Sequence, residues 1–286
     1  MLSPEQRDFF ITYAYNAAVR AGAEVLNIYN NVDDLEIGLK NQKPITLADR
    51  NSHKLILEYL HPTRLPILSE EGRDLLYQER CGWDLFWLVD PLDGTKEFIK
   101  GNGEFTINIA LVYNNKPVLG VIYVPYTRKM FFCDHQVGSF FNSEVVPSLE
   151  ADYTIAEIYA DAHKLPVFAE EHTPIRIAIS RSHNTEQTFA QVEKLKQLHP
   201  DCEIVEQGSS YKFCMLASGM VDYYVRTSHT MEWDTAAGEL ILACAGGSTT
   251  PIGEGAPSCL EYNKADLENP HFVCRSKFAS TINSEK

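Results

Sequence analysis

The spacing of apolar residues predicts two helices near the start of the chain. Apolar positions recur at helical spacing from Phe9 to Ile28, behind a Ser-Pro-Glu-Gln sequence in which Ser3 can cap the helix. We therefore expect a helix from Ser3 through Tyr29. A second helix is expected over residues 47–60, where His61-Pro62 ends it.

Short apolar runs predict the strands of the first half. They are rich in β-branched and aromatic residues and cover residues 66–69, 85–89, 105–113, 118–124 and 129–133. The sequence Asn-Asn-Lys-Pro at residues 114–117 is a hairpin signal between two of these strands. Residues 1–142 are therefore expected to form helices packed on a mostly antiparallel sheet.

Strands and helices alternate in the second half. The predicted strands cover residues 175–179, 203–205 and 223–226, with short ones near 248–250 and 272–274, and the predicted helices cover 185–198, 209–218 and 234–245. Such alternation is typical of an α/β layer architecture. Residues 143–174 show few clear periods, so we interpret them as an insertion or connection between an N-terminal α+β half (1–142) and a C-terminal α/β half (175–286).

Composition and charge narrow the classes of function. The 286 residues suffice for one large or two ordinary domains, and the longest apolar runs are strand-sized, so no intrinsic membrane insertion is expected. The N-terminus does not resemble a signal peptide, which predicts a cytoplasmic location and leaves peripheral inner-membrane association open. The net charge of −14 argues against binding of nucleic-acid polymers but not of a small nucleotide.

The cysteines and histidines make a zinc site improbable. The seven cysteines are scattered without a Cys-x-x-Cys pair and are expected to be reduced packing residues, and the nine histidines show no zinc-binding spacing. Any metal ligands should therefore be oxygens, which favours Mg²⁺, Mn²⁺ or Ca²⁺.

An acidic segment follows directly after the apolar run at residues 85–89. Residues 90–95 read Asp-Pro-Leu-Asp-Gly-Thr. Two carboxylates at the end of a buried strand are costly unless a cation compensates them. Pro91 stiffens the turn and Gly94 permits an unusual backbone conformation, so Asp90, Asp93 and the carbonyl of Leu92 can converge on one point. For a bare Asp-x-x-Asp-Gly, a surface turn would be favoured, and the buried strand in front of it shifts the balance toward metal.

Three other acidic positions are weaker signals on their own. Glu70-Glu71 also follows a predicted strand, but such a pair is usually a solvated turn. Asp49 begins the second helix, where a carboxylate suits the helix dipole. Asp234 is an ordinary N-cap by itself, although the small residues at 236–238 would let that helix start approach a ligand.

The combination of these segments resembles the inositol monophosphatase superfamily. The resemblance rests on Ser-Glu-Glu at 69–71, Asp-Pro-Leu-Asp-Gly-Thr at 90–95 and Trp-Asp-Thr-Ala-Ala-Gly at 233–238. Within the superfamily, residues 93–99, 103–110, 180–183 and 208–214 are similar to the bacterial 3′(2′),5′-bisphosphate nucleotidase branch. Residues 138–142 stand where a small-residue turn is usual. The resemblance implies a layered sandwich of alternating α-β-α-β-α layers, like that of the fructose bisphosphatases.

The resemblance also implies roles for single residues. The metal ligands would be Glu70, Asp90, the Leu92 carbonyl, Asp93 and Asp234, holding two or three Mg²⁺ ions (Mn²⁺ being possible), with Asp49 supporting a third, weaker one. Thr95, with Glu70, would orient and deprotonate the attacking water. The substrate-binding residues would be Glu70, Asp93, Gly94, Thr95, His183, Ser209, Lys212, Arg226 and Asp234. For Lys212 a solvated helix lysine, and for His183 a structural histidine, are the alternatives.

The implied reaction is hydrolysis of the 3′-phosphate of 3′-phosphoadenosine 5′-phosphate to AMP and phosphate, a lithium-sensitive step linked to sulfur assimilation and nucleotide recycling. The sequence lacks an apparent Ser, Cys or His nucleophile with a partnered base, so direct attack by water is preferred. The rivals are an inositol or sugar phosphate phosphatase, a non-catalytic nucleotide- or metal-binding regulator and a Ca²⁺-binding structural module. The sequence leaves open whether the protein is a monomer or a homodimer.

Overall fold

The computed structural model describes residues 2–31, 37–40, 43–150, 152–168 and 172–279. Residues 151 and 169–171 of the expected connection lie outside this description. Among the described residues, none of the helices combines the length and apolarity that a membrane crossing requires.

Two helices open the chain, as the apolar spacing predicts. Helix α1 covers Pro4–Asn30, and Ser3 and Gln6 close a capping box at its start: the Gln6 N–H donates to Ser3 Oγ and the Ser3 N–H to Gln6 Oε1. Helix α2 covers Leu47–Leu60 and begins with a second capping box, formed by Thr46 and Asp49. A 3₁₀ turn, η2 (His61–Thr63), follows it directly.

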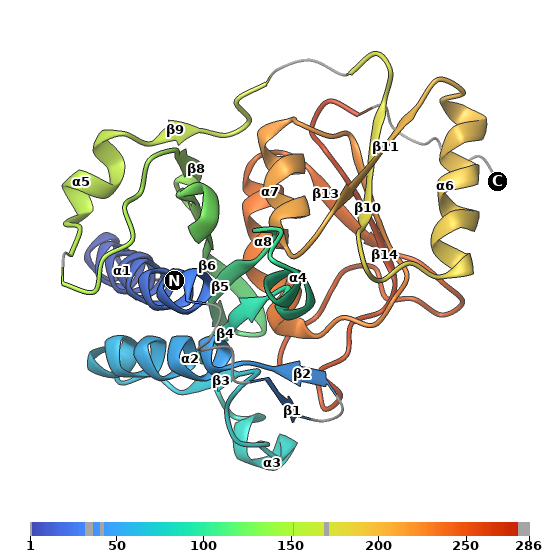
Figure 1. Ribbon diagram of the computed structural model, residues 1–286. Coiled ribbons are helices and arrows are strands. Elements are labelled where there is room, and N and C mark those ends of the chain that lie inside the picture. Colours follow the sequence, from blue (N-terminus) through green and yellow to red (C-terminus); the bar gives the residue numbers. More distant parts are fainter. Residues whose placement is uncertain (1, 32–36, 41–42, 151, 169–171, 280–286) are drawn as a thin grey trace.

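A seven-stranded sheet packs against these helices (Figure 1). Its strands lie in chain order: β3 (Ile67–Ser69), β4 (Leu85–Asp93), β5 (Thr106–Tyr113), β6 (Lys116–Val124), β7 (Lys129–Asp134), β8 (Gly138–Asn142) and β9 (His163–Lys164). Strands β3 and β4 are parallel, and every other neighbouring pair is antiparallel. The predicted hairpin is present between β5 and β6, where Asn114 and Asn115 both have positive φ.

The elements that the sequence pattern did not predict are all short. Residues 138–142 form strand β8 instead of a small-residue turn, and residues 143–174 contain helix α5 (Ile155–Ala160) as well as β9, so this region extends the sheet. Helix α3 (Tyr77–Arg80) and strands β1 (Gly38–Lys40) and β2 (Lys43–Ile45) are also short. Two to six residues are too few to show a period.

The second half forms a mixed five-stranded sheet with the order β11-β10-β12-β14-β13. The elements are β10 (Arg176–Ser180), α6 (Glu186–Leu198), β11 (Glu203–Gln207), α7 (Tyr211–Ser218), β12 (Tyr223–Arg226), α8 (Glu232–Cys244), β13 (Ser248–Pro251) and β14 (Phe272–Arg275). Strand β10 runs parallel to β11 and β12, whereas β14 is antiparallel to both of its neighbours.

The elements stack in five layers, which confirms the predicted α-β-α-β-α sandwich (Figure 1). One apolar cluster joins α1 and α2 to the seven-stranded sheet, and another joins α6 to the five-stranded sheet. Between the two sheets lie α7 and α8, whose apolar residues share a single cluster with both. The approach of α8 is close: a Cβ added to Gly120 on β6 would lie 3.0 Å from the carbonyl oxygen of Ala237.

Candidate active site

A pocket of about 710 Å³ lies where strand ends of both sheets meet the start of α8. Eleven of the predicted site residues line it: Glu70, Asp90, Leu92, Asp93, Gly94, Thr95, His183, Ser209, Lys212, Arg226 and Asp234. Asp49 is not among the lining residues and reaches the pocket through Thr95. The structure thus gathers residues that lie up to 164 positions apart (234 − 70).

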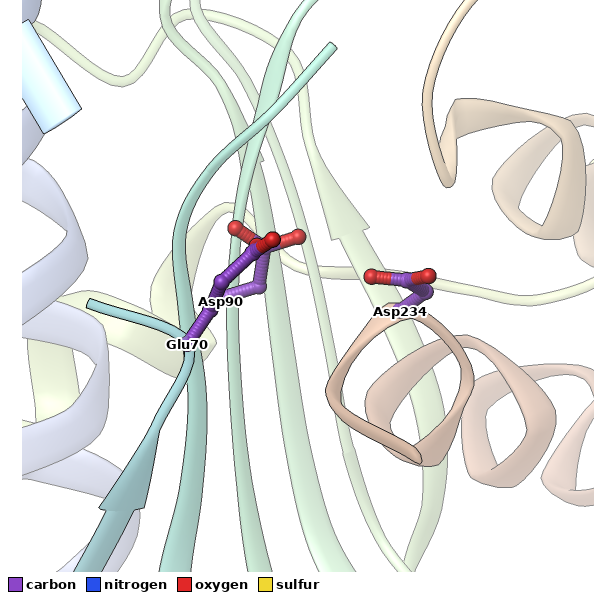
Figure 2. Close-up of side chains that lie close together, drawn as sticks. All are labelled: Glu70, Asp90 and Asp234. Carbon is purple, nitrogen blue, oxygen red and sulfur yellow. The ribbon is translucent and has the colours of Figure 1, made fainter. Parts of the chain in front are cut away.

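Three carboxylates face one another in this pocket (Figure 2). Glu70, Asp90 and Asp234 each offer an oxygen, and these oxygens lie within 4.8 Å of one another. Glu70 and Asp90 are neighbours because β3 and β4 are parallel with Ser69 opposite Val89, so that both strands deliver their next residue to the same edge. Asp234 approaches from the first turn of α8, across from the other two side chains.

The acidic segment is the irregular end of a strand, not a separate turn. Strand β4 continues through Asp93, and its pairing with β5 shifts between Asp90 and Asp93. The Leu92 N–H donates to Asp90 Oδ1 at 3.0 Å, which turns this backbone around the aspartate. Gly94 has φ 95°, and a Cβ there would lie 2.8 Å from the carbonyl oxygen of Glu104, so this position requires glycine.

The electrostatics of the carboxylates call for a cation. Burial, reinforced by Glu70, Asp93 and Asp234, raises the pKa of Asp90 well above its ordinary value. Asp90 Oδ2 is buried and has no hydrogen-bond partner among the described residues. A divalent ion that prefers oxygen ligands would satisfy this oxygen and offset the repulsion, so the residues present fit Mg²⁺ or Mn²⁺.

Asp93 lies at the boundary between the acidic and the basic sides of the pocket. Burial and the nearby Asp234 raise its pKa to about 6, while Lys212 and Arg226 act in the opposite direction. One of its oxygens accepts a hydrogen bond from the Ser210 N–H at the start of α7. Asp93 therefore ties the end of β4 to the start of α7.

Thr95 is hydrogen-bonded to Asp49. Its hydroxyl donates to Asp49 Oδ1 at 3.0 Å and also lies 3.4 Å from the Leu92 carbonyl oxygen. The other Asp49 oxygen accepts from the N–H and the hydroxyl of Thr46, each at 2.6 Å. Asp49 is buried, and burial raises its pKa to about 6. The Asp49 carboxylate, which the sequence placed at a helix start, is thus also hydrogen-bonded to Thr95.

Asp234 is not an N-cap. Helix α8 begins at Glu232, and Asp234 is its third residue, whose carboxylate accepts from the Met231 N–H at 2.8 Å. The predicted start was two residues too late, because Glu232 is charged and does not extend the apolar pattern of the helix. The Glu232 carboxylate accepts hydrogen bonds from the Lys264 side chain and from the N–H groups of residues 263 and 264.

Two basic side chains, Lys212 and Arg226, line the same pocket. Lys212 is buried and donates to the carbonyl oxygens of Gln207 and Ser209, which rules out a solvated helix lysine. Burial, together with Arg226, lowers its pKa to about 7. Arg226 donates to Ser180 Oγ and, at 2.9 Å, to the His229 carbonyl oxygen.

His183 is an exposed residue that also lines this pocket. Its Nε2 is 2.8 Å from Lys96 Nζ, and partial burial together with that ammonium group lowers the pKa of His183 to about 4. The ring is therefore neutral at pH 7 and is not a second cation at the pocket.

Three residues near the pocket received no individual role from the sequence. Lys96 and Arg181 line it, and the Ser210 N–H binds Asp93. Arg181 directly follows strand β10, a position like those of Glu70 and Asp90, whereas Ser210 falls inside the helix predicted for residues 209–218. The position after a strand could have singled out Arg181, but a single arginine is too common to stand out.

Comparison with known proteins agrees with this geometry. Residues 6–285 match the Inositol monophosphatase family. A relative from Salmonella typhimurium, the 3′(2′),5′-bisphosphate nucleotidase CysQ, is 37% identical over 259 residues, covering 89% of this chain and 95% of the relative.

Solved structures show the same fold. The crystal structure of CysQ from Bacteroides thetaiotaomicron, a bacterial member of the inositol monophosphatase family, is 42% identical and superposes with a TM-score of 0.82, covering 93% of this chain and 96% of that one. The extragenic suppressor protein suhB from Bartonella henselae, at 24% identity and a TM-score of 0.71, covers 94% of each chain and shares the fold.

Proposed function

Because the chain belongs to the inositol monophosphatase family, we propose that it is a divalent-metal-dependent phosphatase that hydrolyses the 3′-phosphate of 3′-phosphoadenosine 5′-phosphate. Water is consumed, and AMP and phosphate are released. The observation that carries the proposal is that two charge types line one pocket: the carboxylates of Glu70, Asp90 and Asp234, which cluster together, and the cations of Lys212 and Arg226. The similarity to 3′(2′),5′-bisphosphate nucleotidases supports the choice of substrate.

The metal ligands of this proposal are Glu70, Asp90, Asp93, Asp234 and the Leu92 carbonyl. Their oxygens form a hard donor set that suits two or three Mg²⁺ ions, with Mn²⁺ as an alternative. A bound divalent cation supplies charge neutralisation for the phosphate oxygens and lowers the pKa of water at the site. The orphaned Asp90 Oδ2 and the repulsion among the carboxylates are what this ion would relieve.

Thr95 and Asp49 are the proposed proton-handling pair. Since the Thr95 hydroxyl proton is committed to Asp49 Oδ1, its lone pairs are directed elsewhere and can accept a hydrogen bond from the attacking water. Asp49 Oδ1 then takes the proton that Thr95 passes on as the water attacks phosphorus. Glu70 lines the same pocket and would help to orient that water.

Lys212 and Arg226 are the proposed partners of the 5′-phosphate. Arg226 offers a guanidinium fork and Lys212 a point charge, and both lie near enough to Asp93 to lower its pKa. Binding of a phosphate dianion favours the charged form of Lys212, whose pKa burial has lowered to about 7. Neutral His183 and Ser209 complete the nucleotide side of the pocket.

A phosphate-release panel tests the proposal. We expect 3′-phosphoadenosine 5′-phosphate to be hydrolysed with the highest kcat/KM, ahead of inositol 1-phosphate and fructose 1,6-bisphosphate. The activity should need Mg²⁺, disappear with EDTA and be inhibited by Li⁺. Asp93→Asn is the matched inactive variant, since the amide keeps an acceptor for the Ser210 N–H. A higher kcat/KM for inositol 1-phosphate would overturn the proposed substrate, and full activity in EDTA would overturn the metal assignment.

A cytoplasmic enzyme with this activity would return the nucleotide by-product of sulfur assimilation to the AMP pool. That role is part of the proposal. A growth assay that compares a strain carrying the Asp93→Asn variant with one carrying the unchanged protein, in sulfate and in a reduced sulfur source, would address it.

A further inference from the structure

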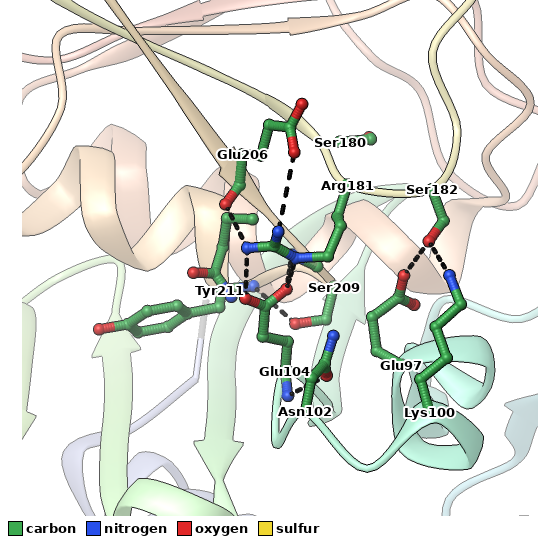
Figure 3. A network of polar contacts seen from close by, with 12 residues as sticks. Glu97, Lys100, Asn102, Glu104, Ser180, Arg181, Ser182, Glu206, Ser209 and Tyr211 are labelled. Carbon is green, nitrogen blue, oxygen red and sulfur yellow. Dashed lines mark hydrogen bonds and ion pairs between the residues drawn. The ribbon is translucent and has the colours of Figure 1, made fainter.

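Polar side chains connect two groups of segments that carry or adjoin residues lining the pocket (Figure 3). On one side are helix α4 (Thr95–Lys100) and the turn after it, which belong with the proposed metal-binding strands. On the other side are the ends of β10 and β11 and the residues that follow, 180–183 and 206–209, which carry or contact the proposed nucleotide-binding groups. Glu97 and Lys100 both bind Ser182, and Glu104 binds Arg181.

The strongest of these connections is the Glu104–Arg181 pair. Arg181 Nε and Nη2 donate to the two oxygens of Glu104 at 2.6 Å and 2.7 Å, which is the bidentate geometry of a strong charge-assisted pair. Nη2 also donates to the Glu206 carbonyl oxygen at 2.8 Å, and Nη1 lies 3.7 Å from Glu206 Oε2. Nε and Nη2 of the guanidinium are therefore held by protein oxygens.

Glu104 holds a second segment as well. Its Oε2 accepts from the Gly208 N–H at 2.8 Å. The backbones meet closely here, because a Cβ on Gly208 would lie 2.8 Å from the Glu104 carbonyl oxygen. One carboxylate thus fixes both residues 181 and 208 against the metal-binding side.

These two residues adjoin the groups proposed to bind the nucleotide. Arg181 follows Ser180, which accepts a hydrogen bond from Arg226, and stands two residues before His183. Gly208 precedes Ser209, whose carbonyl oxygen holds Lys212 and whose φ is 53°. A shift of residues 181 and 208 would therefore displace these groups together, whereas the clustered carboxylates of Glu70, Asp90 and Asp234 lie on other segments.

We propose that Glu104 and Arg181 are a positioning pair, which sets the nucleotide-binding segments at the correct distance from the metal-binding carboxylates and so makes the pocket selective for a nucleotide over a small phosphate ester. This inference rests on the proposed function. Glu104 does not line the pocket, so it acts through Arg181 and Gly208 and not by touching substrate.

In the Glu104→Gln variant, the direction of the change in KM distinguishes a positioning role from a purely electrostatic effect. Removing a negative charge near an anionic substrate should by electrostatics alone strengthen binding, and a released Arg181 could even bind phosphate. A positioning role predicts the reverse: KM for 3′-phosphoadenosine 5′-phosphate rises about tenfold, with kcat little changed. We expect kcat/KM for p-nitrophenyl phosphate, which lacks the nucleoside, to stay unchanged.

Arg181→Ala and the double variant complete the design. If the residues act as a unit, Arg181→Ala raises KM similarly and the double variant loses no more than either single one. Arg176→Ala is the matched control, because Arg176 lies at the other end of β10 in an exposed ion pair with Glu203. Thermal melts confirm that each variant is folded.

The outcomes separate the two proposals. No hydrolysis of the bisphosphate by the unchanged protein refutes the proposed function. Normal hydrolysis combined with an unchanged or lower KM in Glu104→Gln refutes the positioning pair. Equal losses on both substrates would also refute it, since they indicate a general structural defect. A rise in KM for Arg181→Ala alone would make Arg181 a direct phosphate ligand instead.

Discussion

The buried Oδ2 of Asp90 indicates most directly that the pocket requires a cation. Asp90 Oδ1 is satisfied by the Leu92 N–H, whereas Oδ2 has no hydrogen-bond partner among the described residues and lies in a cluster with two further carboxylates. A buried carboxylate without compensation is costly to the folded state. This residue is therefore expected to lower stability until a cation binds.

Asp90→Asn tests that expectation. In EDTA the variant should melt at the same temperature as the unchanged protein or a few degrees higher, because the amide removes the buried repulsion. Mg²⁺ should raise the Tm of the unchanged protein by linkage but leave that of the variant unaffected. Phosphatase activity should fall by several orders of magnitude. The measurements are thermal melts with and without Mg²⁺, and phosphate release.

The control is Asp84→Asn, an exposed aspartate just before the same strand. It should change neither Tm nor activity. A Tm of Asp90→Asn in EDTA clearly below that of the unchanged protein would mean that the carboxylate stabilises the fold without a metal.

Single residues were predictable where their chemistry is local. The stretch Asp90–Asp93 could be identified because two carboxylates after an apolar run are costly, whatever the rest of the fold. The bond between Thr95 and Asp49 could not, since it depends on how α2 packs beside the end of β4. Burial of Lys212 was missed for the same reason: a lysine on a helix has no sequence mark that separates a buried position from an exposed one.

At the scale of elements, the packing of α8 against β6 sets the position of Asp234. Gly120 leaves room for the helix backbone at Ala237, which stands one turn after Asp234. The two atoms nearest to such a Cβ are backbone atoms of Ala237, the carbonyl oxygen at 3.0 Å and the Cα at 3.1 Å, and these cannot rotate away. How closely α8 approaches β6 therefore determines where the Asp234 carboxylate lies.

Gly120→Ala is expected to destabilise the protein by about 1–3 kcal/mol through overpacking. It should also weaken Mg²⁺ binding, because α8 moves outward and carries Asp234 with it. Urea denaturation and the Mg²⁺ dependence of Tm measure the two effects. Gly82→Ala is the control, since a Cβ at Gly82 meets nothing within 4 Å. An unchanged metal affinity in a destabilised Gly120→Ala would separate α8 packing from the site.

Long elements with clear periods and short strands with an apolar run were predicted, and several other short elements were not. Helices α1 and α2 and strands β4 to β7 follow their apolar patterns, because each buries one face or both in a core. Strands β8 and β9 and helix α5 bury few residues and owe their place to neighbours: β8 pairs with β7, and β9 with β8. Such pairings are not encoded in the local pattern.

Across the whole molecule, the middle layer joins the two halves that the sequence suggested. Phe86 and Ile122 of the seven-stranded sheet lie in one cluster with Ile241 of α8 and with Tyr224 and Phe272 of the five-stranded sheet. Neither half therefore completes its core alone. The division into residues 1–142, 143–174 and 175–286 remains a prediction, and its boundaries do not coincide with a boundary of the core.

We expect residues 175–286, expressed alone, to lack a cooperative melt, because α7 and α8 would expose the face that packs on the other sheet. The whole chain should unfold in one transition in urea. Circular dichroism in the near and far ultraviolet measures both, and residues 1–142 serve as the companion fragment. A cooperative melt of residues 175–286 alone would establish two independent domains.

The layered arrangement also determines at which stage of synthesis the site can form. Asp234 is made 144 residues after Asp90 (234 − 90), when most of the chain has already left the ribosome. Until α8 inserts between the sheets, the nascent protein has only the strand-borne carboxylates and the acidic cluster is incomplete. A polypeptide that ends before α8 therefore lacks the complete acidic cluster, and the site forms only once α8 has been synthesised and packed between the sheets.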